Sequence, residues 1–520
     1  MSVMIPVRKQ LINALAEWGS CSGIPRSYQT RPRVAAKQEH HYRDFGSRSL
    51  ALPIFGVVQL THVKSPNFGV TMSFRLIKQL AWWIVIILPP VCFYYLLMES
   101  VSSIPFLDDY NSILSFLLHW KEDHGFQHVV RILFWQHNEY RLMFENAIVS
   151  AQYAMLGHTD IKALCILGDL FVLPIFGALL LIWKTGQASG TSTAIVFAPA
   201  SYLLFQLQYY SAVNDATTSL QYLPVILFAL LSCYLITRKD ALSFSGALCC
   251  LALSIASSGN GFFLLPIGCI MFIQNKGYER LIVWLATGAA MSLIYFSHGY
   301  NFHKTEGGTR GLLSGFAHFS PTFAAAFLGS TGTTSRPVPA IALGILLLVV
   351  FVIATKDRLF ASNPALYYSM LFFIVTAMAV SGLRSDYGAG VPTALGSRYR
   401  IFSVTMVILT YFYLAGKYRD IQWNRAFARA IPVALWITLL GFTIASDWAG
   451  EKQLLMKRQR LEFALMRWYR HEPPLPMTSE GADDYTARMA SLGFFEPIEP
   501  TLSSSIHEGI YRLPQLPGQH

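Results

Sequence analysis

The sequence has little charge for its length. Only 13% of its 520 residues are Asp, Glu, Lys or Arg, whereas soluble domains have roughly 25%. The hydrophobic residues make up 53%, and the mean hydropathy is +0.41. This shortage of charge excludes a large soluble domain and indicates a protein that crosses a membrane many times.

Several chemical motifs are also absent. The seven cysteines contain no C-x-x-C pair, so neither a zinc site nor a disulfide framework is predicted. The chain has no P-loop, no dinucleotide-binding glycine pattern, no H-E-x-x-H and no G-x-S-x-G. Its acids and histidines do not have the spacing of metal ligands, so no metal-binding residue is predicted.

Positive charge, by contrast, is in excess. Lys and Arg number 40 against 29 acids, which gives a formal net charge of +11. Most of these cations lie in the N-terminal segment or in short loops between apolar runs, and the short turns on the other side carry no Lys or Arg. This is the pattern of the positive-inside rule. The surplus therefore predicts the orientation of the chain in a membrane, and no nucleic-acid partner is expected.

The apolar runs predict an all-α polytopic membrane protein with about eleven transmembrane helices. Each run has roughly 17 to 23 residues, enough to cross a hydrocarbon core of about 30 Å. The predicted spans are residues 78–98, 161–183, 192–212, 219–237, 241–257, 259–275, 281–298, 338–355, 364–383, 401–417 and 431–447.

Three parts follow from this pattern. Residues 1–75 are predicted to be a basic, weakly ordered cytoplasmic extension, 76–450 the transmembrane domain, and 451–520 a tail on the outer side. The first outer loop, about 99–160, is long enough to hold juxtamembrane helices. The tail begins with an amphipathic pattern, Glu451 to Tyr469, which would lie on the membrane surface or cap the domain.

Two adjacent carboxylates, Asp108 and Asp109, follow the first span. Neighbouring side chains point in different directions, so at most one is expected to face a site directly. We predict that one is a catalytic base at the outer membrane surface and that the other caps the helix that follows. The alternative is that both simply begin a helix at the water boundary.

A second polar cluster lies later in the same loop, in Trp135-Gln-His-Asn-Glu-Tyr-Arg141. In an extended strand, His137, Glu139 and Arg141 would all lie on one side. In a helix, His137 and Arg141 would share a face. Arginine suits phosphate because its planar guanidinium donates two parallel hydrogen bonds, and histidine binds phosphate, transfers protons or ligates metals. The alternative is a salt-bridge cluster on a juxtamembrane helix.

A third cluster lies in a late outer loop, about 384–400. Its three arginines, Arg384, Arg398 and Arg400, run against the positive-inside trend. Cations at the outer surface suit an anionic lipid headgroup or a diphosphate. Glycines 388, 390 and 396 let the backbone fold closely around a ligand.

The three clusters follow one another along the chain and are all predicted on the outer side of the membrane. In this arrangement the chain resembles glycosyltransferase superfamily C, the polytopic enzymes that use polyprenyl-phosphate sugars. The resemblance rests on Asp108-Asp109 in a long first outer loop, on His137-Asn-Glu-Tyr-Arg141, and on Ser397-Arg-Tyr399 before a late span. The last of these is similar to a pattern in bacterial membrane proteins of surface-polysaccharide loci. The resemblance in architecture covers about residues 80–450, whereas the resemblance in sequence is confined to these short motifs.

The resemblance implies an inverting hexosyltransferase whose site faces the periplasm in a bacterial inner membrane. Asp108 or Asp109 would be the base, and His137 and Glu139 would orient donor or acceptor. The leaving lipid phosphate would be held by Arg141, Arg384, Arg398, Tyr399 and Arg400. The implied partners are a polyprenyl-phosphate sugar donor, a glycan or lipid-linked acceptor, and membrane lipid. No cofactor is certain, and a divalent cation is left open.

Two other hypotheses stay open. An O-antigen polymerase or ligase would also span the membrane many times, but these enzymes usually concentrate function in a large later loop. A transporter or lipid flippase would place ionisable residues or broken helices at mid-membrane. Only Asp169, inside the second predicted span, is a candidate for such a site.

Overall fold

A computed structural model describes ten stretches of the chain, residues 74–122, 125–137, 140–186, 193–297, 299–301, 319–333, 336–385, 390–418, 425–470 and 499–514. The chain divides into two units, Met1–Val70 and Thr71–His520, and every described residue lies in the second. The predicted cytoplasmic extension therefore lies almost wholly outside the described residues.

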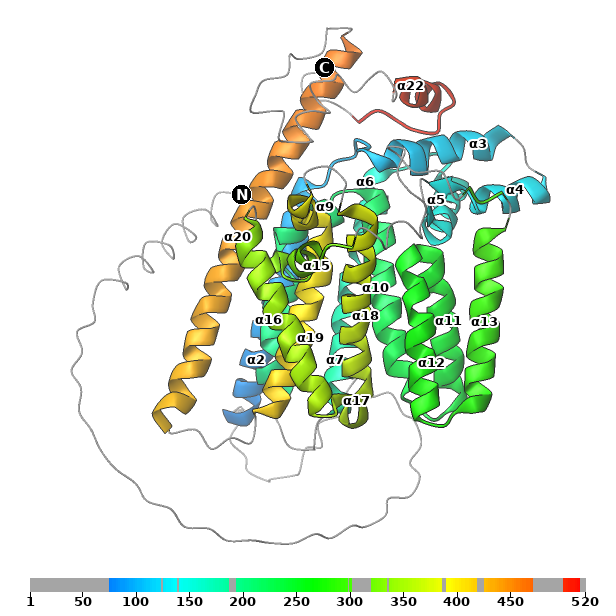
Figure 1. The fold of residues 1–520 in the computed structure, drawn as a ribbon. Helices are drawn as coiled ribbons and strands as arrows, with labels where there is room; N and C mark the ends of the chain where they lie inside the picture. Colours follow the sequence, from blue (N-terminus) through cyan, green and yellow to red (C-terminus); the bar gives the residue numbers. More distant parts are fainter. Residues whose placement is uncertain are drawn as a thin grey trace, which may run out of the picture. The chain divides into compact units, whose positions relative to one another are not determined.

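The described residues are mostly helical, which confirms the all-α class (Figure 1). The helices of the bundle are α2 (Phe74–Ser100), α6 (Ile161–Asp169), α7 (Val172–Thr185), α8 (Thr193–Leu204), α10 (Ala216–Ile236), α11 (Ala241–Ser257), α12 (Leu264–Gln274), α13 (Tyr278–Phe296), α16 (Pro337–Lys356), α18 (Pro364–Arg384), α19 (Arg400–Lys417) and α20 (Arg425–Tyr469). Among the described residues, eight helices are long and apolar enough to cross a membrane. The predicted number of eleven is not confirmed, because α8, α11 and α12 are shorter.

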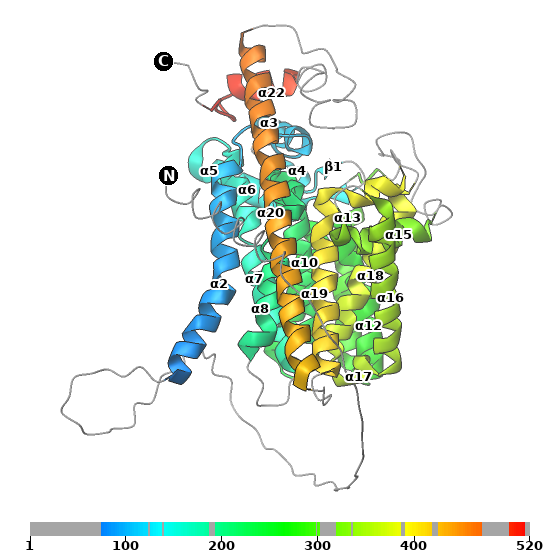
Figure 2. The same ribbon diagram turned by 90° about the vertical axis from the view of Figure 1, so that its left-hand side faces the viewer.

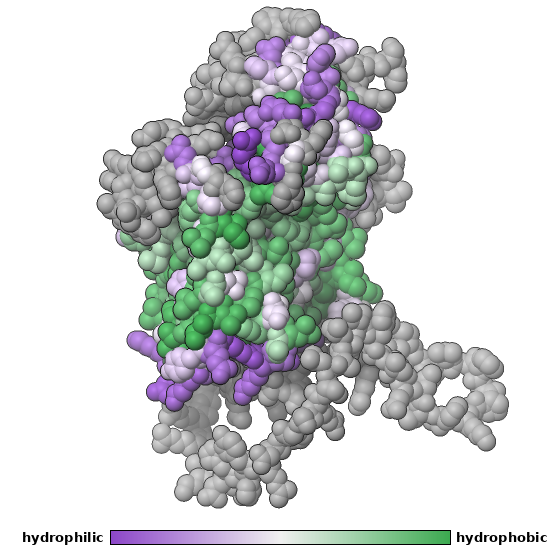
Figure 3. Space-filling view, turned by 90° about the vertical axis from the view of Figure 1, so that its right-hand side faces the viewer, coloured by the Kyte–Doolittle hydropathy of each residue, from purple (hydrophilic) through white to green (hydrophobic). Residues whose placement is uncertain are grey.

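The surface fits a protein surrounded by lipid. Figure 3 shows an apolar band on the face drawn, with hydrophilic residues at both ends of it. Large apolar side chains are exposed on several helices, among them Trp83, Ile282 and Val338 at 54%, 68% and 75%. Exposing such surface to water costs about 25 cal/mol per Å², whereas in lipid it is the expected arrangement.

The loop between α2 and α6 matches its predicted limits and holds short helices. It contains a π-helix and three α-helices, η1 (Tyr110–Ser115), α3 (Phe116–Glu122), α4 (Phe126–Leu133) and α5 (Met143–Leu156), and two paired strands, β1 (Gln136–His137) and β2 (Tyr140–Arg141). The loop therefore holds short helices, and their position beside a membrane stays a prediction. In Figure 1 these helices lie at one end of the bundle, and α17 (Leu359–Ser362) lies at the other.

Two predicted spans contain a break. In the run 161–183, α6 ends at Asp169 and α7 begins at Val172. The run 192–212 is not a single helix, because α8 ends at Leu204 and two short helices follow, η2 (Leu207–Tyr209) and α9 (Tyr210–Val213). This second break is stabilised from α20. The Asp447 carboxylate accepts a hydrogen bond from the Leu207 N–H at 2.9 Å. Gly450 approaches Leu207 so closely that a Cβ would lie 2.2 Å from its carbonyl oxygen.

The predicted last span and the predicted amphipathic helix form one continuous helix, α20. Its 45 residues extend over about 67 Å at 1.5 Å per residue, which exceeds a hydrocarbon core of about 30 Å. Figure 2 shows α20 running along the bundle and past α3. Its amphipathic part buries Leu454, Leu461 and Leu465, so it packs against the protein and caps the domain.

The last described segment, α22 (Glu499–His507) and residues 508–514, lies against the first outer loop. The Thr159 N–H donates to the Ile510 carbonyl at 2.7 Å, and the Tyr511 hydroxyl donates to the Ser103 carbonyl at 3.1 Å. Lys121 forms an ion pair with Glu508 at 3.0 Å. The C-terminal segment therefore connects both ends of that loop.

Candidate active site

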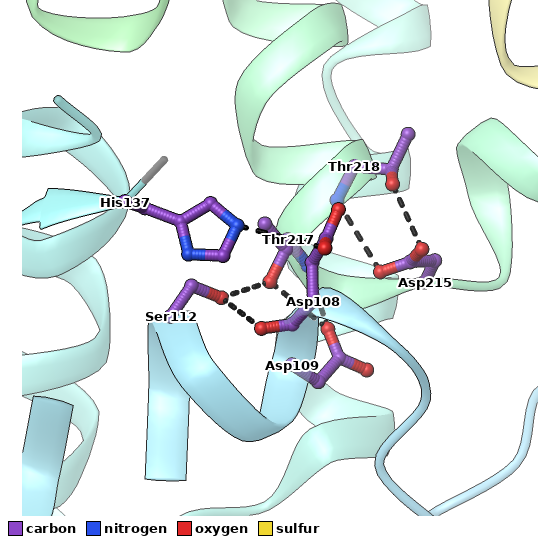
Figure 4. A network of polar contacts seen from close by, with 7 residues as sticks. All are labelled: Asp108, Asp109, Ser112, His137, Asp215, Thr217 and Thr218. Carbon is purple, nitrogen blue, oxygen red and sulfur yellow. Dashed lines mark hydrogen bonds and ion pairs between the residues drawn. The ribbon is translucent and has the colours of Figure 1, made fainter. Parts of the chain in front are cut away.

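Of the two adjacent carboxylates, Asp109 is the buried one, at 1% exposed. Its Oδ1 accepts hydrogen bonds from the backbone N–H and the hydroxyl of Thr217, both at 3.0 Å. Its Oδ2 accepts from the Phe106 N–H at 3.0 Å. Because Thr217 lies in the first turn of α10, Asp109 fixes its own loop to a helix that begins far along the chain (Figure 4).

The predicted cap on the following helix is therefore wrong. Asp109 makes no side-chain hydrogen bond to the start of η1. It shares the start of α10 with Asp215, whose carboxylate accepts from the Thr218 N–H at 3.4 Å and from its hydroxyl at 2.8 Å. The first N–H groups of a helix lack partners and carry partial positive charge, which favours carboxylates there.

Asp108 lies in the turn that Asp109 fixes, and its side chain is 31% exposed. Its Oδ1 lies 3.5 Å from Nε2 of His137. Leu107, just before it, has a φ of 50°, a left-handed conformation that costs a non-glycine residue about 1–2 kcal/mol. Just after it, the π-helix η1 begins at Tyr110, and π-helical turns are frequent at functional sites. The backbone is thus irregular on both sides of Asp108.

The charges around Asp108 favour its ionised form. Burial raises the pKa of Asp108, but the hydrogen bond and charge of His137, with the charges of Arg398 and Arg384, hold it below its ordinary value. Within the part of the chain that the structure describes, the Arg398 guanidinium makes no hydrogen bond or ion pair, and it lies 5.1 Å from the Tyr399 ring. Its N–H donors are therefore available to an anion close to Asp108.

The β1–β2 hairpin changes the predicted grouping of His137 and Arg141. In its register His137 pairs with Tyr140, and Gln136 pairs with Arg141. Cross-strand partners share a face, so His137 and Arg141 lie on opposite faces. The prediction that they share a side is wrong because the chain reverses between them. Glu139 lies outside the described residues, and its predicted role stays a prediction.

The face that carries Arg141 packs on the end of α13. The Arg141 guanidinium donates to the Ser297 carbonyl at 2.6 Å and lies 5.5 Å from the Tyr300 ring. Gln136 exchanges two hydrogen bonds with the backbone of Asn301, at 2.9 and 2.8 Å. Arg141 therefore anchors the hairpin, and its predicted contact with phosphate stays a prediction.

Two other predicted phosphate ligands are also held by the protein. Arg400 is 5% exposed and donates to the carbonyls of Gln208 and Leu395 at 3.2 and 3.0 Å. The Tyr399 ring is buried against the rings of Phe327 and Tyr222, at 5.3 and 6.2 Å between centroids. Two of the predicted cations, Arg398 and Arg384, instead lower the pKa of Asp108 through their charge.

Glu145, in the first turn of α5, is a carboxyl group that sequence reasoning missed. It is 1% exposed, and burial raises its pKa to about 8 against the smaller, opposing effect of the nearby Ser112 and Thr217 hydroxyls. Those two hydroxyls contact each other, and the Ser112 hydroxyl donates to the Asp108 carbonyl at 2.9 Å. Glu145 therefore carries a proton at neutral pH next to the loop of Asp108. Its only signal in the sequence is an acid in an otherwise uncharged helix.

Among the described residues, no group of three or more His, Cys, Asp or Glu side chains has the geometry of a metal site. The arrangement around Asp108 instead offers an ionised carboxylate that can take a proton, with an imidazole beside it and guanidinium groups that can bind an anion. Comparison with protein-family models, curated proteins and solved structures found no match to this chain.

Proposed function

We propose that this protein is a membrane glycosyltransferase that moves a sugar from a polyprenyl-phosphate donor to a hydroxyl of a glycan or lipid-linked acceptor. The main support is one ionised, partly exposed carboxylate, Asp108, in the field of two arginines, Arg384 and Arg398. Sugar transfer from a phosphate requires a base for the attacking hydroxyl. It also requires cations where the phosphate charge develops.

Asp108 is the base in this proposal. Its carboxylate takes the proton of the acceptor hydroxyl while that oxygen forms a bond to the anomeric carbon. The bond from this carbon to the phosphate oxygen breaks on the opposite face, and its electron pair leaves with the lipid phosphate. The configuration at the carbon is therefore inverted. Arg398 and Arg384 stabilise the departing phosphate, and His137 orients the carboxylate from 3.5 Å.

The site faces the periplasm in a bacterial inner membrane in this proposal. The loops at the opposite end of the bundle are basic, with Lys184, Lys239 and Lys356 at or just after the ends of α7, α10 and α16. The positive-inside rule assigns such loops to the cytoplasm, which leaves the Asp108 end outside. A glycan or lipid-linked acceptor of the cell envelope would be available there.

One observation favours a second candidate function, a lipid flippase. Asp169 is 1% exposed at the point where α6 ends, and α7 begins three residues later. Neither of its carboxyl oxygens has a hydrogen-bond partner among the described residues. Ionisable residues and broken helices within a membrane mark substrate paths in transporters.

Sugar transfer by the full-length protein in liposomes tests the proposal. The donor is a radiolabelled polyprenyl-phosphate sugar, and the acceptor is a glycolipid extract of the cell envelope. Arg398→Ala is expected to lower transfer about 100-fold or more, as removal of an anion-stabilising donor does. Arg336→Ala, which removes an exposed arginine at the same end, is the matched control and should leave it unchanged. Lipid movement without any transfer by the wild type would support the flippase instead.

A further inference from the structure

Lys457 is a buried cation that lies far along the chain from the loop of Asp108. It belongs to α20 and is 6% exposed. Its ammonium donates to the Asn214 carbonyl at 2.8 Å and lies 3.8 Å from the centroid of the Phe106 ring. Phe106 begins the turn that carries Asp108, and Asn214 precedes the start of α10. One ammonium therefore contacts both segments that meet at Asp109.

The helix that carries Lys457 is fixed on both sides of this residue. Before it, Asp447 and Gly450 hold α20 against Leu207, as described above. After it, the Arg458 guanidinium donates to the Glu99 carbonyl at the end of α2 at 2.7 Å, and to Glu462 at 2.7 Å. The part of α20 that carries Lys457 is therefore held in place by contacts on both sides of this residue.

Two buried carboxyl groups lie within the field of Lys457. Its charge acts on both Asp109 and Asp215, which are 1% and 6% exposed. Burial raises the pKa of both groups, and that of Asp215 much more. Asp109 accepts three hydrogen bonds from N–H and O–H donors, which favours its ionised form. A buried anion without a compensating cation is strongly destabilising, and Lys457 supplies that cation.

We infer that Lys457 is a positioning residue for Asp108. By holding Phe106 and balancing the charge of Asp109, it keeps the Asp108 carboxylate in the place where His137 and Arg398 act on it. This inference rests on the proposed transfer activity, because it assigns the last long helix a part in that reaction. Lys457 contacts neither the reacting groups nor Asp108 itself.

The test compares Lys457→Met with Lys452→Met in the full-length protein, measuring kcat, KM and the pH profile of kcat/KM. Lys452 lies on α20 and is exposed, so its replacement should change nothing. Lys457→Met is expected to lower kcat at least about tenfold with KM unchanged. The acidic limb of its kcat/KM profile should move to higher pH. Asp108, displaced from His137 and Arg398, would lose the charges that favour its ionised form, so its pKa would rise. A simple loss of folded protein would lower the rate equally at every pH.

Phe106→Leu is the second variant, in case Lys457→Met does not fold. It removes the ring beneath the ammonium and keeps an apolar side chain, so the same shift of the acidic limb is expected with a smaller loss in kcat. Lys457→Arg, which keeps the charge, should recover most of the rate. A wild-type profile in Lys457→Met, or in Phe106→Leu when Lys457→Met does not fold, overturns the inference. If the wild type transfers no sugar, the proposed function itself fails.

Discussion

At the scale of single residues, neighbours decide what a carboxyl group does. Asp108 and Asp109 are identical and adjacent, yet Asp109 accepts three hydrogen bonds in the interior and Asp108 faces an imidazole and two arginines. The sequence was enough to predict that the two would differ and that at most one would face a site. It could not show which one, because the partner of Asp109 is Thr217, at the start of a distant helix.

Glu145 gives a pH prediction at this scale. Its pKa is raised from 4.5 to about 8 by burial, so between these values the folded protein holds a proton that the unfolded chain has lost. Stability therefore falls as pH rises through this window, at up to about 1.4 kcal/mol per pH unit.

Glu145→Gln keeps the shape of the protonated acid and cannot ionise. We expect its thermal unfolding midpoint to decline less between pH 5 and 8 than that of the wild type, measured in detergent. Asp160→Asn, a change at a half-buried N-cap, serves as the control. Parallel curves for Glu145→Gln and the wild type would contradict a protonated Glu145.

At the scale of elements, the sequence predicted helices well and their interruptions poorly. The structure has short helices between α2 and α6, as apolar runs and polar boundaries indicate, because these are local signals. The break after Leu204 and the continuity of α20 were not predicted. Both depend on contacts between distant segments, such as that of Asp447 with Leu207. The separation of His137 and Arg141 by the hairpin was likewise not predicted, because alternation along a strand does not reveal where the chain reverses.

The C-terminal segment gives the prediction for this scale. Ile510 is fully buried beside Thr159, so Ile510→Ala should lower the free energy of unfolding by about 2–5 kcal/mol. It should also increase hydrogen exchange in the first outer loop. Lys121→Ala, which removes a solvent-accessible ion pair and hydrogen bond to Glu508, should have little effect. Unchanged exchange in the Ile510→Ala variant would show that the tail does not hold this loop.

At the scale of the whole molecule, alternating loop charge placed the three polar clusters on one side. The structure brings part of each cluster to the same end of the bundle, since His137 and Arg398 both act on Asp108. Arg141 and Arg400 reach that end but are bound by backbone carbonyls. The sequence was enough to predict that the clusters lie at one end of the molecule. Only the packing shows that Arg141 and Arg400 bind the protein itself, whereas Arg384 and Arg398 act on Asp108.

The orientation of the molecule in the membrane is the prediction at this scale. In a variant without cysteines, Arg336→Cys should react with a membrane-impermeant maleimide in intact spheroplasts. Lys239→Cys, an exposed position at the other end, should react only after the membrane is permeabilised. The reverse labelling would put Asp108 in the cytoplasm and exclude a periplasmic acceptor.

The most direct measurement is the rate of sugar transfer by Asp108→Asn beside Asp109→Asn, each corrected for the amount of folded protein. Loss of a general base costs about 100- to 10,000-fold, so Asp108→Asn should lose at least 100-fold in kcat while its thermal unfolding midpoint stays near that of the wild type. Asp109→Asn should show a different pattern, with a lower unfolding midpoint and a smaller loss of kcat per folded molecule than Asp108→Asn, because Asp109 only positions the turn that carries Asp108. Transfer at the wild-type rate by Asp108→Asn would contradict the assignment of Asp108 as the base.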